Sequence, residues 1–503
     1  MTPSCHFAKG RTWIASCRLH RILACVLTAV FLTSCAVAQP DPTPAGEARQ
    51  PGIVALPSQW TAAVPAGTSD EAPAPQSTTQ DTPGTLQAIS QPAGTAIPSP
   101  SPTYEPLAVE GPWLILCDTD RQIVISDGSG PQIRIPASGN CYEQSAVSTT
   151  ARRLAFLAVG AEGNASLRVL QLPGMEIVGE ADLADTDLHD VEQISWSPDG
   201  GILAYLVTTR AAAAELHAYT VGEASARLLE SRDGEISIMG WSPDGRWLVA
   251  LSGQGRLEDV WAVSLAGSAA RTVYHHASSS DMYYWGSILG WTGKSTLVME
   301  EGPGEGCSFA LREFDLDSGT GRILYGSSFV EPRLDPASRS VFLGIREPGM
   351  CAYDLEPGVY RVDTAAPSPR LILKGTGWER LLWLGPLGPL GVRTSAPAGI
   401  QAYTADGNRR SFFADAAELF ASPDGAWALS RTTGGGLSLV DRLGASTRMI
   451  TDRSPQGAVW LPDSSAFYVL EDNGAVYRMA VEGDDRPTFV AESASRILGI
   501  LAP

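Results

Sequence analysis

Histidine and aspartate come nearest to a metal-binding pattern in this chain. Four Asp flank His189 within residues 182–190, and His275 is followed directly by His276. Carboxylate oxygens and imidazole nitrogens bind divalent cations, but residues 182–190 lack the Asp-x-Asp-x-Asp-Gly spacing of a calcium loop. Adjacent residues of a strand point to opposite faces, so His275 and His276 would not share one ion. The sequence therefore predicts no metal site and no bound cofactor.

No nucleophile motif of a familiar catalytic class is present in the sequence. The nearest approach to Gly-x-Ser-x-Gly is the run 240–244, which begins with Gly240 but ends in Asp244. Phosphate-loop and dinucleotide fingerprints are absent, and the three glycines at 434–436 suit a hairpin tip. We therefore expect no catalytic activity. The alternative is a lyase or hydrolase that uses Asp and Arg at a central channel.

The most distinctive residues form a motif that must be positioned by regular structure. Trp-Ser-Pro-Asp-Gly occurs at 196–200 and again at 241–245. Ser-Pro-Asp-Gly matches a β-turn, because Pro presets the second position and Gly is favoured at the fourth. Alternating apolar residues follow each turn, which is typical of a half-buried strand. We interpret the motif as structural; its residues are Trp196, Pro198, Asp199, Gly200, Trp241, Pro243, Asp244 and Gly245, with Pro423, Asp424 and Gly425 in a copy that lacks the Trp.

Weaker copies of the motif indicate a β-propeller. The Trp-equivalent positions are 147, 196, 241, 291, 334, 383, 421 and 460, which gives a period of 38–50 residues. Such a period, with several short strands per unit, is typical of four-stranded propeller blades. Residues 113–117, 122–125 and 132–135 look like three strands before the first repeat. Residues 496–501 look like a single strand after the last, and we expect this strand to complete the first blade and close the ring.

The number of blades depends on how many of the weak repeats are counted. Eight repeats and one split blade would make nine, whereas propellers typically have four to eight blades. The units at Val147 and Leu334 are the weakest. We favour eight blades and leave seven or nine open. The predicted fold class is all-β, with a single propeller over residues 107–503, and we place the alanine-rich run at 211–216 in a loop within a hairpin.

Residues 1–34 have the pattern of a lipoprotein signal peptide. Basic residues end at Arg21, and an apolar run of about eleven residues follows, too short for a comfortable membrane span. Leu-Thr-Ser then precedes Cys35, which resembles the bacterial lipobox. The resemblance implies cleavage before Cys35, acylation of this residue with palmitate-type chains, and membrane anchoring. The alternative is an ordinary secretory signal that is cut after residues 36–38.

Residues 35–106 predict a lipid-anchored, disordered linker, because Pro, Ala, Thr, Ser, Gly and Gln dominate it. An apolar island contains Ile53, Val54, Leu56 and Trp60. We interpret the island as solvated, with a docking segment as the alternative. Removing the four positive charges of residues 1–34 from the total of −19 leaves −23, which argues against a nucleic-acid partner.

Four cysteines follow the signal peptide and linker: Cys117, Cys141, Cys307 and Cys351. An even number in an exported chain predicts disulfides rather than a metal site. Cys307 and Cys351 fall at matching points of consecutive units, so neighbouring blades would bring them together. Cys117 would then pair with Cys141.

The repeats at 196–200, 241–245 and 421–425 resemble those of TolB-like propellers, also called WD40-like repeats. The resemblance covers residues 107–503 and implies the fold without specifying a function. Related repeats occur in prolyl-oligopeptidase-type and dipeptidyl-peptidase-type enzymes, whose hydrolase domain carries the nucleophile motif that this sequence lacks. TolB has an α/β domain where this chain has its linker, so the partnership of TolB with peptidoglycan-associated lipoprotein is not carried over.

These observations combine into one functional expectation. We expect a propeller in the bacterial cell envelope, anchored to the membrane through Cys35 and facing outside the cytoplasm. Because a rigid scaffold on a long linker carries no recognisable catalytic set, its expected role is to bind a protein, peptide or glycan on one face of the ring. The loops around residues 182–190 and 275–284, which do not repeat, are the expected contact regions.

Overall fold

The computed structural model describes residues 106–107, 111–128, 131–137, 141, 143–159, 165–183, 191–208, 213–254, 257–267, 270–274, 284–303, 308–347, 353–445, 447–483 and 486–501. All of them belong to one compact unit. The proposed signal peptide, Cys35 and the linker up to residue 105 lie outside these residues. No helix in the described part of the chain is long and apolar enough to cross a membrane.

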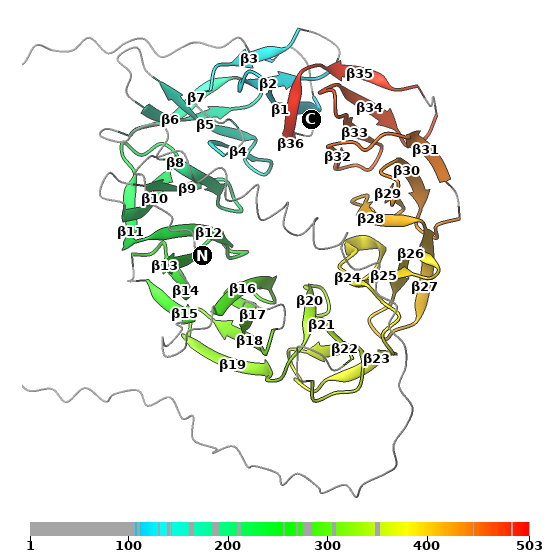
Figure 1. Cartoon of the computed structure of the whole chain (residues 1–503). Helices are drawn as coiled ribbons and strands as arrows, with labels where there is room; N and C mark the ends of the chain where they lie inside the picture. The colour runs from blue at the N-terminus through cyan, green and yellow to red at the C-terminus, as the bar shows by residue number, and fades with distance from the viewer. Residues whose placement is uncertain are drawn as a thin grey trace, which may run out of the picture. The chain divides into compact units, whose positions relative to one another are not determined.

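The described residues form nine antiparallel four-stranded sheets, arranged around a ring as the blades of a propeller (Figure 1). Blade 1 combines β36 (Ala494–Leu501) with β1 (Trp113–Asp118), β2 (Ile123–Ser126) and β3 (Ile133–Ile135). Blades 2–5 comprise β4 (Ser145–Ser148), β5 (Arg153–Val159), β6 (Ala165–Gln171) and β7 (Glu176–Asp182); β8 (Val191–Trp196), β9 (Ile202–Thr208), β10 (Ala213–Thr220) and β11 (Arg227–Asp233); β12 (Glu235–Trp241), β13 (Trp247–Gln254), β14 (Leu257–Ser264) and β15 (Arg271–Tyr274); and β16 (Tyr284–Trp291), β17 (Thr296–Pro303), β18 (Ala310–Asp315) and β19 (Thr320–Tyr325).

The remaining four blades follow in the same order along the chain. They comprise β20 (Val330–Asp335), β21 (Ser340–Ile345), β22 (Gly358–Asp363) and β23 (Arg370–Lys374); β24 (Arg380–Leu382), β25 (Leu390–Ser395), β26 (Ala398–Tyr403) and β27 (Arg409–Ala414), with a short 3-10 helix η2 (Gly385–Leu387); β28 (Ala416–Ala421), β29 (Trp427–Thr432), β30 (Leu437–Asp441) and β31 (Thr447–Thr451); and β32 (Gly457–Trp460), β33 (Ala466–Leu470), β34 (Val476–Ala480) and β35 (Thr488–Ala491). In each of blades 2–9 the first strand lies nearest the centre of the ring (Figure 1).

The Ser-Pro-Asp-Gly motif forms the turn from the first to the second strand of its blade. Asp199 Oδ1 accepts hydrogen bonds from Ser197 Oγ at 2.6 Å and from the Gly201 amide at 3.0 Å. Ser197 Oγ accepts one from the Ile202 amide at 2.9 Å, and Gly200 has a φ of +68°. The hydrogen bond from Ser197 is the main reason why the pKa of Asp199 is lowered. The same bonds recur at Ser242, Asp244 and Arg246, and at Ser422, Asp424 and Ala426.

The ring has nine blades, so the favoured count of eight is one too low. The two doubtful units are genuine blades: the Val147 unit is β4–β7 and the Leu334 unit is β20–β23. Their turns lack the motif Gly and place the positive φ one residue later, at Arg152 (+54°) and Arg339 (+51°). In blade 9, Ser464 stands at the position of the motif Gly and has a φ of +63°. Because other residues adopt this strained conformation, the motif fades although the turn is retained.

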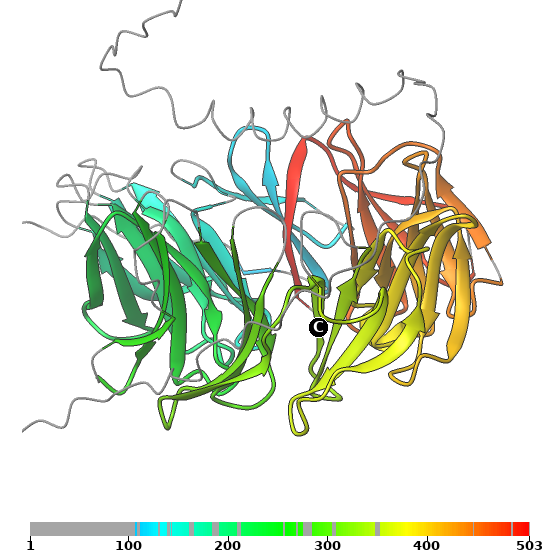
Figure 2. The same cartoon turned by 60° about the horizontal axis from the view of Figure 1, so that its bottom comes forward.

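The first blade closes the ring as predicted. Figure 2 shows the red C-terminal strand β36 beside the blue N-terminal strands. β36 pairs with β1 in antiparallel register, with Trp113 opposite Leu501 and Leu116 opposite Ile497. A disulfide joins Cys117 of β1 to Cys141, with a Cα–Cα distance of 5.9 Å. The second predicted pair, Cys307 with Cys351, lies outside the described residues.

The tryptophans of the motif pack between neighbouring blades, with one exception. Trp196 donates its indole hydrogen bond to the Ala146 carbonyl at 3.0 Å, and Trp460 donates to the Phe420 carbonyl at 2.9 Å. In blade 7, β24 ends at Leu382, and Trp383 is 51% exposed. Leu384 takes the core position instead.

The outer strand of blades 2–9 carries a β-bulge at one repeated position. The residue without a register partner is Val178, Leu229, Val273, Leu324, Ile372, Arg410, Ile450 or Val490. A bulge twists an edge strand and thereby discourages edge-to-edge pairing. In five blades an exposed apolar side chain directly precedes the bulge: Leu228, Ile323, Leu371, Met449 and Phe489.

Candidate functional site

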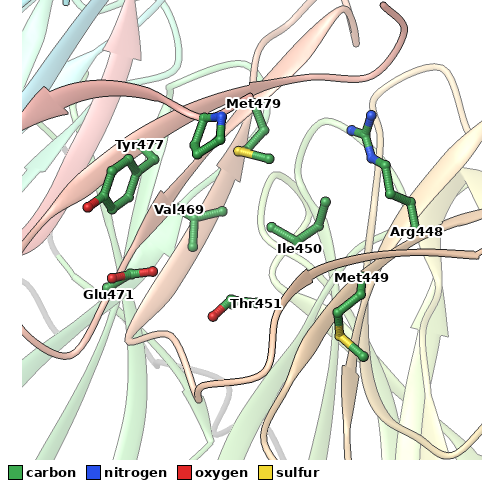
Figure 3. A pocket seen from close by; sticks show the side chains of 9 residues that line it. Arg448, Met449, Ile450, Thr451, Val469, Glu471, Tyr477 and Met479 are labelled. Carbon is green, nitrogen blue, oxygen red and sulfur yellow. The ribbon is translucent and has the colours of Figure 1, made fainter. Parts of the chain in front are cut away.

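A groove of about 350 Å³ opens at the outer side of the junction between blades 8 and 9 (Figure 3). We call it the 8–9 groove. One wall is the outer strand of blade 8, and the other comes from β33 and β34 of blade 9. The lining residues are Arg448, Met449, Ile450, Thr451, Val469, Glu471, Tyr477, Met479 and Pro487.

The bulge of β31 supplies two of the apolar side chains that line the groove. Ile450 has no register partner on β30, because Leu437 pairs with Thr451 and Ser438 with Met449. Ile450 packs against the core that contains buried Val469 and Met479. Met449 points outward and is 64% exposed. Two consecutive apolar residues of one strand thus supply both the floor of the groove and its open rim.

The neighbouring aromatic and charged groups fix the shape of the groove. Arg448 Nη2 donates a 2.6 Å hydrogen bond to the Ala480 carbonyl and so ties β31 to blade 9. Tyr477 meets Phe489 edge to face, with ring centroids 6.0 Å apart, and Phe489 is 51% exposed. Figure 3 shows Tyr477 and Glu471 on one side, Arg448 on the other, and aliphatic side chains between them.

This arrangement is suited to binding an extended apolar segment. Ligand sites in proteins are typically concave, mostly apolar and on the order of 300–1,000 Å³. Methionine side chains adapt their shape to apolar partners, and Met449 and Met479 both line the groove. The opposite charges of Arg448 and Glu471 would fix the direction of a bound segment.

Charged side chains also converge where blades 5, 6 and 7 meet. Ser308 Oγ donates to Glu300 Oε2 at 2.5 Å, and burial raises the pKa of Glu300. Arg333 Nε donates to the Leu381 carbonyl at 3.0 Å, and Glu331 Oε2 accepts from the Leu381 amide at 2.7 Å. Burial lowers the pKa of Arg333. The hydrogen bonds of Arg333 and Glu331 join blade 6 to blade 7, so these two charged side chains hold neighbouring blades together.

A second hollow of about 500 Å³ lies between the first strands of blades 9 and 1, β32 and β36. Residues 456–459 and 495–499 form most of its lining. Gly457 leaves open space at its Cβ position, which widens the hollow. Arg496 is the only residue among those lining it that carries a full charge, and burial lowers its pKa.

The site residues considered from the sequence do not gather at these surfaces. His189, His275 and His276 lie outside the described residues, and Asp182 is an exposed residue at the end of β7. Within the described ranges, no group of three or more His, Cys, Asp and Glu could hold a metal ion. None of the motif turn residues lines the 8–9 groove. The groove was not predicted from the sequence, although two consecutive apolar residues, Met449 and Ile450, break the alternation of an edge strand.

Comparison with known proteins adds information about the fold alone. No protein-family model and no curated protein sequence matches the chain. A structure of a eukaryotic initiation factor is 11% identical, with a TM-score of 0.52, over 78% of this chain and 98% of that one. Dipeptidyl peptidase 4 of Porphyromonas gingivalis is 10% identical, with a TM-score of 0.50, over 70% and 59% of the two chains.

TolB from Acinetobacter baumannii is 12% identical over 65% of this chain and 74% of that one, with a TM-score of 0.28. The structural likeness to the initiation factor and to the dipeptidyl peptidase concerns the fold alone and leaves the activity open. The nine four-stranded blades and their repeated Ser-Pro-Asp-Gly turns confirm the β-propeller that the sequence predicts.

Proposed function

We propose that this protein is a membrane-anchored, extracytoplasmic binding module whose 8–9 groove takes an extended segment of a protein or peptide. The observation that carries the proposal is the groove itself, with Met449 64% and Phe489 51% exposed beside it. Both residues sit on strands of a packed sheet. A surface that is rigid before binding loses little conformational entropy when its ligand arrives.

The lining favours a peptide over a glycan. Its apolar side chains are aliphatic or thioether groups, namely Ile450, Val469 and Met479 within the groove and Met449 at its rim. Sugar rings require several polar groups to satisfy their hydroxyls, because an unpaired buried hydroxyl is costly. A peptide instead places alternate side chains into such a groove. The best ligand is an apolar segment with an acidic residue near Arg448 and a basic residue near Glu471.

Binding is tested by a matched pair of variants. Met449→Arg places a charge in the groove, whereas Ile323→Arg changes a 51% exposed residue at the same blade position of blade 5. Chemical crosslinking in intact cells, followed by affinity purification, should recover partners with wild type and Ile323→Arg but not with Met449→Arg. Equal recovery from both variants would remove the groove from the proposal.

The membrane anchor rests on the sequence around Cys35, which resembles a lipobox. Mass spectrometry of the mature protein should find an acylated Cys35 at the N-terminus. An unmodified N-terminus at or beyond Gln39 would contradict anchoring, and the protein would then be a secreted binding module.

A second candidate function is catalysis by the charged side chains where blades 5, 6 and 7 meet, favoured by Glu300 of β17. Its raised pKa and its contact with Ser308 are properties of a general acid. A panel of peptide and glycan substrates, tested with wild type and Glu300→Gln, addresses this candidate. Turnover by wild type that Glu300→Gln abolishes would support it, whereas turnover that Glu300→Gln retains would exclude Glu300 as the acid.

A further inference from the structure

Arg380 is an exposed cation for which the described part of the chain supplies no counter-charge. It lies on β24, the strand of blade 7 nearest the centre of the ring (Figure 1). Its guanidinium forms no hydrogen bond or ion pair with any residue that the structure describes. The protein is strongly acidic outside residues 1–34, so a cation in this state calls for an explanation.

The backbone on both sides of this arginine is held by blade 6. Arg346 Nη2 donates to the Glu379 carbonyl at 2.8 Å, and Arg333 Nε donates to the Leu381 carbonyl at 3.0 Å. Glu331 Oε2 accepts from the Leu381 amide at 2.7 Å. Bonds from another blade therefore fix the peptide groups that flank the exposed side chain. A group presented on a fixed backbone loses little main-chain entropy when it binds a ligand.

A second guanidinium lies near the first. Arg333 of β20 is half-buried, and its Nη1 donates to the Pro332 carbonyl at 2.7 Å, in addition to the bond from its Nε. These bonds use two of its three nitrogens and fix the direction of the third. Burial lowers the pKa of Arg333, and the positive charge of Arg380 adds to this lowering. The two cations thus repel each other, and an anion bound to both would relieve the repulsion.

The neighbouring carboxylates do not neutralise Arg380. Each of them interacts with another arginine: Glu331 with Arg346 at 3.2 Å, Glu379 with Arg393 at 3.3 Å, and Glu300 with Arg333 through their opposite charges. Among the described groups that interact here, one positive charge therefore remains in excess, that of Arg380.

We propose that Arg380 and Arg333 form a binding site for an oxyanion, on the inner strands of blades 6 and 7. The ligand class is a carboxylate or a phosphate, because either presents two oxygens to the paired N–H groups of one guanidinium. Arg380 is the exposed group that meets the ligand, and Arg333 adds a second charge whose direction is already fixed.

This site is separate from the 8–9 groove. It lies on β20 and β24, whereas the groove is lined by residues of β31, β33 and β34 together with Pro487. The inference therefore does not depend on the proposed function, and it requires no catalysis by Glu300.

Chemical modification of the full chain, purified in detergent, tests the site. Phenylglyoxal modifies accessible guanidinium groups, and peptide mapping by mass spectrometry gives the rate at each arginine. The probes are sodium succinate and inorganic phosphate, each compared with sodium chloride at the same ionic strength. The rate at Arg380 should fall along a saturation curve, to about one tenth at ten times the half-protecting concentration. Arg442 is the control, since it is also exposed and its guanidinium bonds no described residue.

The two probes distinguish the sources of the oxyanion. Protection of Arg380 by succinate alone would identify a carboxylate ligand, protection by phosphate alone would identify a phosphorylated ligand, and protection by both would support the shared chemistry. An unchanged rate at Arg380 with both probes, or an equal fall at Arg442, would overturn the inference.

A pair of variants separates binding from a general effect of salts. The protecting probe should raise the Tm of wild type and of Arg442→Gln by the same amount relative to chloride, because it binds the folded state. The shift should be lost in Arg380→Gln, whose substituted side chain bonds no described residue in wild type and is exposed. A full shift in Arg380→Gln would show that the anion binds elsewhere.

Discussion

Two glycines with the same turn role but different neighbours give the sharpest test of the packing between blades. Gly200 and Gly245 occupy the fourth position of identical motifs, with φ of +68° and +71°. A Cβ at Gly200 would lie 2.3 Å from Ser148 Oγ and 2.4 Å from Ala151 Cβ in blade 2. A Cβ at Gly245 would lie 3.6 Å from its nearest neighbour, Pro198 Cδ, which is ordinary contact.

The structure therefore assigns different costs to the same substitution. Gly245→Ala has only the left-handed backbone to accommodate, at about 1–2 kcal/mol. Gly200→Ala has the same backbone cost and also overpacks the boundary between blades 2 and 3, which adds about 1–3 kcal/mol. We expect a total loss of about 2–5 kcal/mol for Gly200→Ala.

Thermal unfolding followed by circular dichroism, in one buffer and at one scan rate, measures the difference. Both variants should retain the wild-type spectrum at about 20 °C, which is well below the unfolding temperatures usual for such domains. Gly200→Ala should unfold at a clearly lower temperature than Gly245→Ala. Equal shifts would refute the reasoning, because they would mean that the turn of blade 3 does not pack against blade 2 as described.

Two further predictions concern acid stability and the disulfide. Hydrogen bonds from Trp247 and Arg246 lower the pKa of Asp317 from 3.8 to about 2, so Asp317 contributes stability that is present above pH 3.8 and lost as the pH falls toward 2. Acid titration of unfolding should show a smaller loss between pH 4 and pH 2 in Asp317→Asn than in wild type, and an unchanged profile would contradict the assignment. Replacing Cys117 by Ser opens a loop with a sequence separation of 24, so the free energy of unfolding in denaturant should fall by about 3 kcal/mol under oxidising conditions. Under reducing conditions, which break the Cys117–Cys141 bond of wild type, the difference between the two proteins should disappear.

The propeller could be predicted from the sequence because its signals are local. Ser197 and Asp199 form hydrogen bonds within a few residues, and these bonds require the residue types seen in the motif. The closing strand was predictable for a similar reason, since residues 496–501 had no other partner. The blade count was not, because the turns of blades 2 and 6 lack the motif Gly and place the positive φ one residue later, at Arg152 and Arg339.

Tertiary context decided the features that the sequence did not show. Residues 213–216 of the predicted loop at 211–216 belong to β10, so pairing with neighbouring strands overrides the loop prediction. Trp383 occupies the packing position of its repeat, yet Leu384 fills the core and leaves Trp383 51% exposed. The 8–9 groove depends on two blades meeting, and Met449 and Val469 are brought together only by that packing.

Photo-crosslinking at a single residue tests the central claim, that the 8–9 groove is where this protein binds its ligand. A benzophenone side chain would replace Met449 in one protein and Ile323, the matched exposed residue of blade 5, in another. Illumination of intact cells should give a discrete adduct with a second protein from position 449 and none from position 323. Identical adducts from both positions, or no adduct from position 449, would contradict the account.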